Sequence, residues 1–193
     1  MEHGNVEGAI AAYSKALSIK PGSSELHHKM ANALQEQGNL EEAVEAYSKA
    51  LSIKPDYAEV YNNMVNALKN QGKVEEAMDS YDKALSVKPD YAMAATNKAT
   101  LLFECKRFEE AGKLFSMDNS IKNQSYFLKC LYELDKKSEF YDQLDYLIER
   151  GENNNVIGSY ISQSKIRYGI NRENPFCNDP LKYVLTKNLN FLM

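Results

Sequence analysis

The chain has 193 residues, of which 44% are hydrophobic and 26% are charged, a composition typical of a folded rather than a disordered protein. Its 23 basic and 27 acidic residues give a formal net charge of −4, which argues against nucleic-acid binding through bulk electrostatics. No run of 18 apolar residues and no charged-then-apolar leader occurs, so we expect neither a membrane span nor secretion, and a cytoplasmic location. The widely spaced Cys105, Cys130 and Cys177 lack a CxxC pair, which favours a reducing compartment over a disulfide or zinc framework.

A repeat of 34 residues organises the first half of the chain. Five positions keep this step, and they hold glycine, alanine, tyrosine, alanine and proline in that order. The residues are Gly4, Gly38 and Gly72; Ala9, Ala43 and Ala77; Tyr13, Tyr47 and Tyr81; Ala16, Ala50 and Ala84; Pro21, Pro55 and Pro89. A fixed period of this length indicates a solenoid, in which units that cannot bury their apolar face alone stack on one another.

Each unit reads as a pair of helices. Residues 40–53 place apolar side chains at i, i+3, i+4 and i+7, with Asn39 as a candidate N-cap and Pro55 as the stop. Residues 25–37 form the preceding helix, which ends at Gly38. One unit is therefore expected to be a helix, a tight turn, a second helix and a proline stop.

These signature positions carry a family resemblance. The segment GNLEEAVEAYSKALSIKP and its copy GKVEEAMDSYDKALSVKP resemble the tetratricopeptide repeat (TPR), and the resemblance extends over residues 1–118. It departs from the family where the first helix of a unit usually carries a large aromatic residue and Leu-Gly. The resemblance implies an all-α fold, a right-handed TPR superhelix, or α-solenoid, of antiparallel helix pairs.

Four segments follow from the register of the repeat. Residues 1–22 are expected to be the second helix of a truncated first TPR, and 23–118 the TPR array. Residues 119–151 read as a degenerate TPR-like helix pair. Residues 152–193 read as a C-terminal helix at 156–168, an irregular connector, and a short helix that opens at Asp179-Pro180.

The first helix is expected to lack part of its cover. Its apolar stripe consists of Val6, Ile10, Tyr13 and Leu17, and the helix that would precede it in a full unit is missing. Two readings remain open: the sequence is a fragment of a longer chain, or a second copy covers this stripe and forms a homodimer.

The candidate site is a peptide-binding groove, because the first helices of stacked units line the concave wall of a solenoid. On the helix of residues 58–70, the stripe that faces the core is expected to be Tyr61, Met64, Val65 and Leu68. On the first helix of the preceding unit, His27 is expected in the core. The groove residues are then His28, Lys29, Asn32, Glu59, Asn62, Asn63, Asn66, Asn70, Thr96, Asn97 and Thr100. Asparagine amides both donate and accept, so they can hold an extended peptide backbone; the alternative is a solvated polar face.

Family precedents sharpen this interpretation. Residues 58–71 resemble the repeats of the glycosyltransferase that adds N-acetylglucosamine to serine and threonine, in which an asparagine ladder holds the substrate backbone. Asn63 and Asn97 match the ladder position, whereas Lys29 breaks it. The basic residues of the chaperone-tail carboxylate clamp would fall on Met93 and Asn97, so that clamp is not expected.

Catalysis is not expected in this chain. The histidines are His3, His27 and His28, and neighbours on a helix point about 100° apart, so His27 and His28 cannot share a metal. We predict no cofactor, no metal and a non-catalytic scaffold for protein–protein interaction. The tail is similar to connectors that precede 2-oxoglutarate oxygenase domains in bacterial TPR proteins. The alternative is therefore a substrate-recognition or dimerisation arm of a larger enzyme, with its catalytic domain outside these residues.

Overall fold

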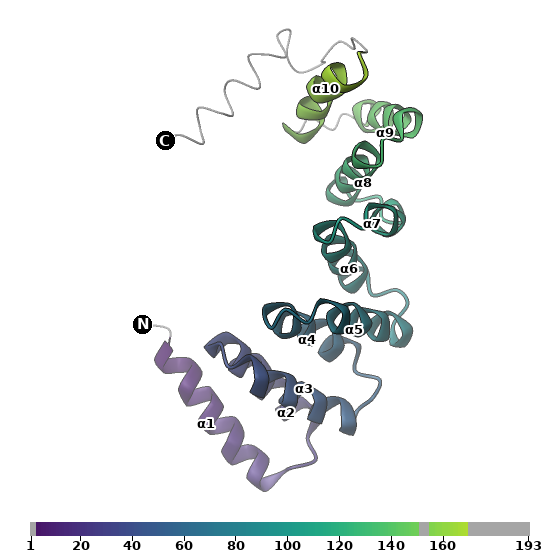
Figure 1. Cartoon of the computed structure of the whole chain (residues 1–193). Coiled ribbons are helices and arrows are strands. Elements are labelled where there is room, and N and C mark those ends of the chain that lie inside the picture. Colours follow the sequence, from purple (N-terminus) through teal and green to yellow (C-terminus); the bar gives the residue numbers. More distant parts are fainter. Residues whose placement is uncertain (1–2, 151–154, 170–193) are drawn as a thin grey trace. The chain divides into compact units, whose positions relative to one another are not determined.

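The computed structural model describes residues 3–150 and 155–169, and these form helices without a strand (Figure 1). The helices are α1 (His3–Ile19), α2 (Ser24–Gln37), α3 (Leu40–Ile53), α4 (Ala58–Asn70), α5 (Val74–Val87), α6 (Ala92–Glu104), α7 (Phe108–Ser116), α8 (Ile121–Glu133), α9 (Lys137–Glu149) and α10 (Asn155–Tyr168). The chain divides into two compact units, Met1–Lys98 and Ala99–Met193, and the boundary falls inside α6. The expected connector and short C-terminal helix lie outside the described residues.

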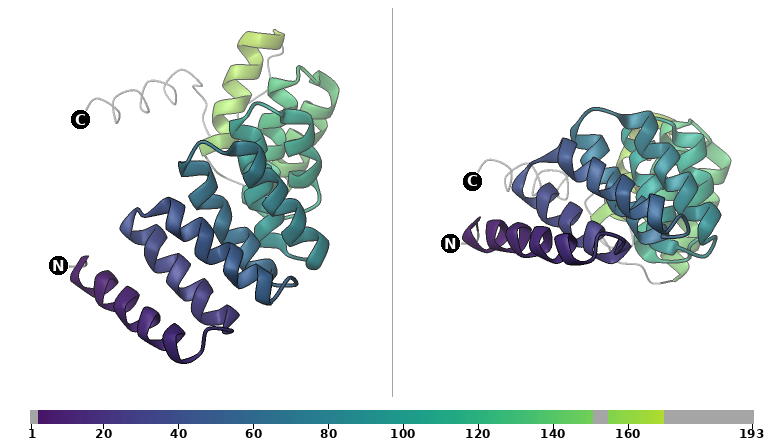
Figure 2. Two further views of the ribbon diagram at one scale, coloured as in Figure 1. Left: turned by 60° about the horizontal axis from the view of Figure 1, so that its bottom comes forward. Right: turned by 90° about the horizontal axis from the view of Figure 1, so that it is seen from below.

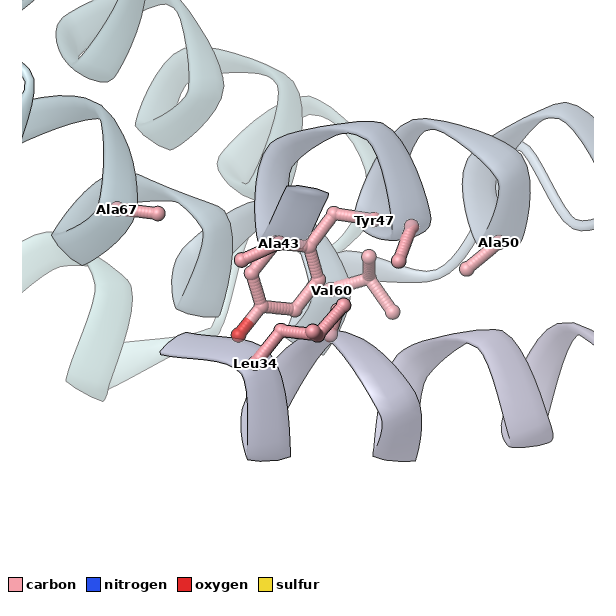
Figure 3. Close-up of a cluster of buried hydrophobic side chains, with 8 residues drawn as sticks. Leu34, Ala43, Tyr47, Ala50, Val60 and Ala67 are labelled. Carbon is pink, nitrogen blue, oxygen red and sulfur yellow. The ribbon is translucent and has the colours of Figure 1, made fainter. Parts of the chain in front are cut away.

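In the first unit each helix packs against the next, from α1 through α5, and the short turns make neighbours antiparallel (Figure 2). The core around α3 consists of Ala31, Leu34, Ala43, Ala46, Tyr47, Ala50, Val60 and Ala67 (Figure 3). The repeated alanines are small because α2 and α4 both pack against α3, and Ala43, Tyr47 and Ala50 are fully buried there. The predicted helix pairs are confirmed, with boundaries within a residue of those expected for α2, α3 and α4.

The turn between the two helices of a unit requires a left-handed residue. Gly38 has φ of 90° and Gly72 has φ of 77°. The next residue then bonds back to the helix: Asn39 N–H donates to the Leu34 carbonyl and Lys73 N–H to the Leu68 carbonyl, both at 2.9 Å. The repeated glycine is thus explained by its backbone conformation, since a side chain is strained at this φ.

The second unit keeps this turn without the glycine. Lys106 and Asp135 take its place, with φ of 60° and 57°. The same bonds close the turn, from Arg107 N–H to the Leu102 carbonyl at 2.9 Å and from Lys136 N–H to the Leu131 carbonyl at 3.0 Å. Helix α7 has 9 residues whereas α5 has 14, which accounts for the shorter step from Lys106 to Asp135.

The second unit has its own core. Its buried side chains come from α8, α9 and α10 and are Leu128, Leu131, Phe140, Tyr141, Leu144, Leu147 and Ile161. Tyr132, Tyr160 and Tyr168 pack around them, with ring centroids 5.2–6.2 Å apart. These three aromatic residues therefore pack between helices.

Two smaller expectations have clear outcomes. Asn39 stands at the N-cap position of α3, but its amide bonds to Gln37 Oε1 instead of capping the helix. The stripe of α1 is only half-buried, at Val6, Ile10, Tyr13 and Leu17. None of the described helices combines the length and apolar character needed to cross a membrane.

Candidate peptide-binding face

The candidate site lies on α2, α4 and the part of α6 that belongs to the first unit; we call this surface the polar face. Of the predicted residues, those exposed on it are Lys29, Asn32, Glu59, Asn66 and Asn70. Those half-buried are Asn63, Thr96 and Asn97. Thr100 is also half-buried but belongs to the second unit. The structure thus brings together most of the predicted set, drawn from three successive first helices.

Two predicted groove residues are buried instead of open, and the prediction is wrong for both. His28 and Asn62 are each 6% exposed. The ring of His28 packs edge-on against Tyr57, with centroids 5.3 Å apart, and 6.1 Å from the ring of Tyr47. Because α2 contacts both α3 and α4, the side of α2 that carries His28 is closed by its neighbours.

His27 was expected in the core and is instead half-buried. Its Nε2 lies 3.0 Å from the Pro21 carbonyl, in the loop before α2. The sequence does contain a feature that favours burial of His28 instead of His27. Tyr57 and Tyr91 stand one position before successive first helices, and an aromatic residue there needs a partner on the helix that precedes it.

A chain of hydrogen bonds runs through the polar face and joins α2, α4 and α6. Asn32 and Asn63 both direct their Nδ2 at His28 Nε2, at 3.3 and 3.0 Å. Asn62 Nδ2 donates to Asn63 Oδ1 at 3.1 Å, and Asn97 Nδ2 donates to Asn62 Oδ1 at 3.2 Å. Three of the four asparagines in this series of hydrogen bonds, Asn62, Asn63 and Asn97, therefore link the first helices of successive repeats. The sequence did not predict this role.

This series of hydrogen bonds ends at Tyr47, in the core around α3. Tyr47 Oη donates to Asn32 Oδ1 at 2.6 Å and contacts Gln35 Oε1 at 3.3 Å. The nitrogen of an amide can only donate, so His28 Nε2 accepts from Asn32 Nδ2 and Asn63 Nδ2, and the neutral ring carries its proton on Nδ1. The acceptor at His28 Nε2 thereby fixes which way each asparagine amide of the series is oriented.

The surroundings of His28 favour the neutral ring. Burial lowers the pKa of His28, and Lys29 acts in the same direction, whereas Glu59 and Glu25 oppose the shift. Burial also raises the pKa of Tyr47, so its hydroxyl stays protonated and able to donate. The network is thus held together by two groups that are both uncharged near neutral pH.

Outside this network, two asparagines keep open amides. Asn66 and Asn70 are exposed on α4, and neither side chain makes a hydrogen bond with any described residue. Glu59 is exposed as well, and among the described residues it has no ion-pair partner. Its counterpart Glu25 pairs with Lys29 at 2.7 Å, but the matching place after Glu59 is taken by Asn63. Among the described residues, the polar face therefore offers the amides of Asn66 and Asn70 and the carboxylate of Glu59 without a partner.

Other chemistry finds little support in the described part of the chain, where no group of His, Cys, Asp and Glu could hold a metal ion. Burial raises the pKa of Cys130 to about 12, so this thiol stays protonated and is a poor nucleophile. One hollow of 390 Å³ lies beside the turn at Gly38 and Asn39, and another of 240 Å³ lies between α7 and α8. Neither is lined by a residue of the polar face.

Comparison with known proteins identifies the repeat. The model "TPR repeat" matches residues 1–38 and 32–72, and the model "Tetratricopeptide repeat" matches residues 58–91. The matches together cover residues 1–91, a little under half of the chain, and support the tetratricopeptide repeats predicted there; the predicted resemblance extends further, to residue 118. No curated protein sequence matches the chain significantly.

Solved structures share the fold. The chain is similar to the PilF protein of Pseudomonas aeruginosa, with a TM-score of 0.71, 21% identity, and coverage of 98% of this chain and 86% of that one. It is similar to MamA, with a TM-score of 0.66, 19% identity and coverage of 89% and 91%. It is also similar to YrrB, described as a TPR protein with an unusual peptide-binding site, with a TM-score of 0.67, 20% identity and coverage of 82% and 84%. The prediction of an all-α solenoid of helix pairs is confirmed.

Proposed function

We propose that this chain is a non-catalytic scaffold that binds an extended segment of a partner protein along the polar face of α2, α4 and α6. The observation that carries the proposal is the pair of open amides, Asn66 and Asn70, beside a row of internally bonded ones. An extended backbone presents unpaired N–H and carbonyl groups, and an asparagine side chain satisfies one of each. The peptide-binding site described for YrrB, on a similar fold, supports the same class of function.

Within this proposal the asparagines have two different tasks. Asn66 and Asn70 contact the ligand, whereas Asn62, Asn63 and Asn97 hold the helices that carry them. Lys29 and Glu25 neutralise each other, whereas Glu59 has no ion-pair partner among the described residues and is a charge that can select a ligand. A segment with a basic side chain next to its captured backbone fits this arrangement.

The test begins with a random dodecapeptide library displayed on phage, selected on the full chain. A recovered dodecapeptide is then synthesised with a fluorescent label, and its affinity is measured by fluorescence anisotropy. We expect Asn66→Ala combined with Asn70→Ala to weaken binding about tenfold or more, since each lost hydrogen bond to a backbone group is worth about 1 kcal/mol.

A matched control uses polar residues on the outer side of the same unit. Ser48 and Ser52 are exposed on α3, and their hydroxyls bond only to carbonyls of their own helix. Ser48→Ala combined with Ser52→Ala should leave the affinity unchanged. Equal affinity for the wild type and the Asn66/Asn70 variant, with both folded by circular dichroism, would place the ligand elsewhere and refute the proposal.

A further inference from the structure

The hydrogen-bond chain of the polar face has a titratable group at its centre. His28 Nε2 receives two amide donors, one from its own helix and one from α4, at 3.3 and 3.0 Å. The ring is 6% exposed, so water cannot replace either partner. A side chain in this position decides how the two asparagines are oriented.

Protonation is incompatible with this arrangement. A second proton on the ring would occupy Nε2 and point at two amide nitrogens, which can only donate. If Asn32 turned over, its nitrogen would face Tyr47 Oη, and the hydroxyl would have to redirect its proton from Asn32 Oδ1 at 2.6 Å to Gln35 Oε1 at 3.3 Å. If Asn63 turned over, its nitrogen would face Asn62 Nδ2, which now donates to Asn63 Oδ1 at 3.1 Å. Each reversal would pass along the chain to the next residue.

We propose that His28 is the positioning residue of the polar face, and that it aligns α2, α4 and α6 for ligand binding only while its ring is neutral. The inference rests on the proposed function, since it names the group that regulates the same face. When the ring takes up a proton, Asn32 and Asn63 lose their common acceptor and the link from α2 to α4 opens. Binding along the polar face then weakens.

Charged and titratable groups on every side of His28 enter this balance. Glu25 and Lys29 lie on α2, Glu59 on α4, Tyr47 on α3 and Tyr57 in the connection between α3 and α4. The two glutamates favour the protonated ring, and Lys29 opposes it. Burial outweighs the glutamates, and the pKa of His28 is lowered. The neutral ring is therefore the form present at neutral pH, and acidification supplies the other form.

The decisive experiment needs no ligand. NMR spectra of the full chain, labelled with ¹⁵N and ¹³C, are recorded between pH 7.5 and 5, following the side-chain amides of Asn32 and Asn63 and the ring of His28. We expect both amides to shift with the same midpoint as the His28 ring. In His28→Gln, which keeps an acceptor but cannot titrate, that transition should vanish, whereas His27→Gln should retain it. Amide signals that do not follow the ring, or a transition that persists in His28→Gln, would overturn the inference.

A second measurement connects the inference to binding. The affinity of the selected dodecapeptide is compared at pH 7.5 and at a pH below the NMR midpoint, for the wild type, His28→Gln and His27→Gln. We expect a loss of about fivefold or more in the wild type and in His27→Gln, and none in His28→Gln, since coupling between sites is commonly of this size. Absence of peptide binding at any pH would reject the proposed function while the NMR result still stands. Binding with equal pH dependence in all three proteins would reject the role of His28.

Discussion

The two units of the chain build the same helix hairpin from different sequences. In the first unit the turn is made by Gly38 and Gly72, and in the second by Lys106 and Asp135, yet all four residues have positive φ and all four turns close with the same backbone bond. The hairpin is therefore specified by the backbone bonds and the buried apolar positions more than by the glycine itself. Glycine makes the turn easier to form, and its loss marks where the consensus fades, not where the fold ends.

The units also differ in how their helices are joined. In the first unit a polar chain through His28, Asn63 and Asn97 runs across three helices. In the second unit aromatic rings pack between the helices, such as Tyr132 against Phe140 and Tyr160. The chain of asparagine hydrogen bonds is therefore a feature of the first unit, whereas the second unit combines aromatic packing with hydrogen bonds such as the one from Gln143 Nε2 to Gln124 Oε1 at 2.7 Å.

The largest effect is expected from the aromatic residue that recurs at one repeat position of the second helices. Tyr47 and Phe115 occupy the same repeat position and are both 0% exposed. Truncation to alanine should cost about 3–5 kcal/mol of unfolding free energy in each case, because it leaves a cavity. Tyr13, at the same position of α1, is only half-buried and should cost markedly less. Urea unfolding followed by circular dichroism measures all three, and a Tyr13→Ala loss equal to that of Tyr47→Ala would contradict the comparison.

A smaller loss is expected at the turn of the first unit. Gly38→Ala should destabilise the chain by about 1–2 kcal/mol, because an L-residue is strained at φ of 90°. Steric overlap adds nothing, since a Cβ at this position meets no atom within 4 Å. Gly22 has equal space but no positive φ, so Gly22→Ala is the matched control and should be neutral or slightly stabilising. Equal thermal unfolding midpoints for Gly38→Ala and Gly22→Ala would show that the left-handed backbone is not what the glycine supplies.

The reverse change should stabilise the second unit. Lys106→Gly relieves the strain of a side chain at φ of 60°, and after the entropy of glycine is subtracted the gain should be about 0.5 kcal/mol. Asp135→Gly should gain less, because aspartate tolerates this region better than lysine. Lys106→Ala removes the same side chain but keeps the strain, so it should give no gain. Differential scanning calorimetry distinguishes the outcomes, and a gain in Lys106→Ala equal to that in Lys106→Gly would point to the side chain instead.

Most of the fold could be predicted from the sequence, because a 34-residue step in five residue types leaves few architectures to choose from. The fourth hairpin was harder to read. Helix α7 is shortened, which moves the turn residue Asp135 out of step, and neither Lys106 nor Asp135 resembles the glycine that it replaces. The positive φ of Lys106 could be found only from coordinates, since a lysine in the sequence does not predict a left-handed backbone.

The candidate site was only partly predictable. The helical spacing places Asn66 and Asn70 on an open face correctly, because both lie away from any neighbouring helix. The helical spacing wrongly predicts that His28 and Asn62 are open, because a helix in a solenoid is covered on two sides. The spacing within one helix does not reveal how closely α4 packs against α2. The hydrogen bonds between asparagines 35 residues apart, such as Asn62 and Asn97, depend on that packing and could not be predicted from the spacing within one helix.

The most selective effect is expected from pH. Because the pKa of His28 is lowered in the folded chain, the unfolded chain binds its proton first, at pH values near the ordinary value of about 6.5. The stability that the neutral ring contributes is therefore complete above this pH and is lost as the pH falls below it, with a slope of at most about 1.4 kcal/mol per pH unit. The pKa of Glu25 is also lowered, by its bond to Lys29, but its contribution is lost only at more acidic pH.

The two units can be separated in this measurement because His3, His27 and His28 all belong to the first. Urea unfolding of the wild type between pH 7.5 and 5 should show a loss of stability in the transition that Tyr47→Ala weakens, and none in the transition that Phe115→Ala weakens. His28→Gln should remove most of the slope and His27→Gln should keep it. An equal slope in both transitions would assign the pH dependence to surface carboxylates common to the two units, and the polar network would then be indifferent to acid.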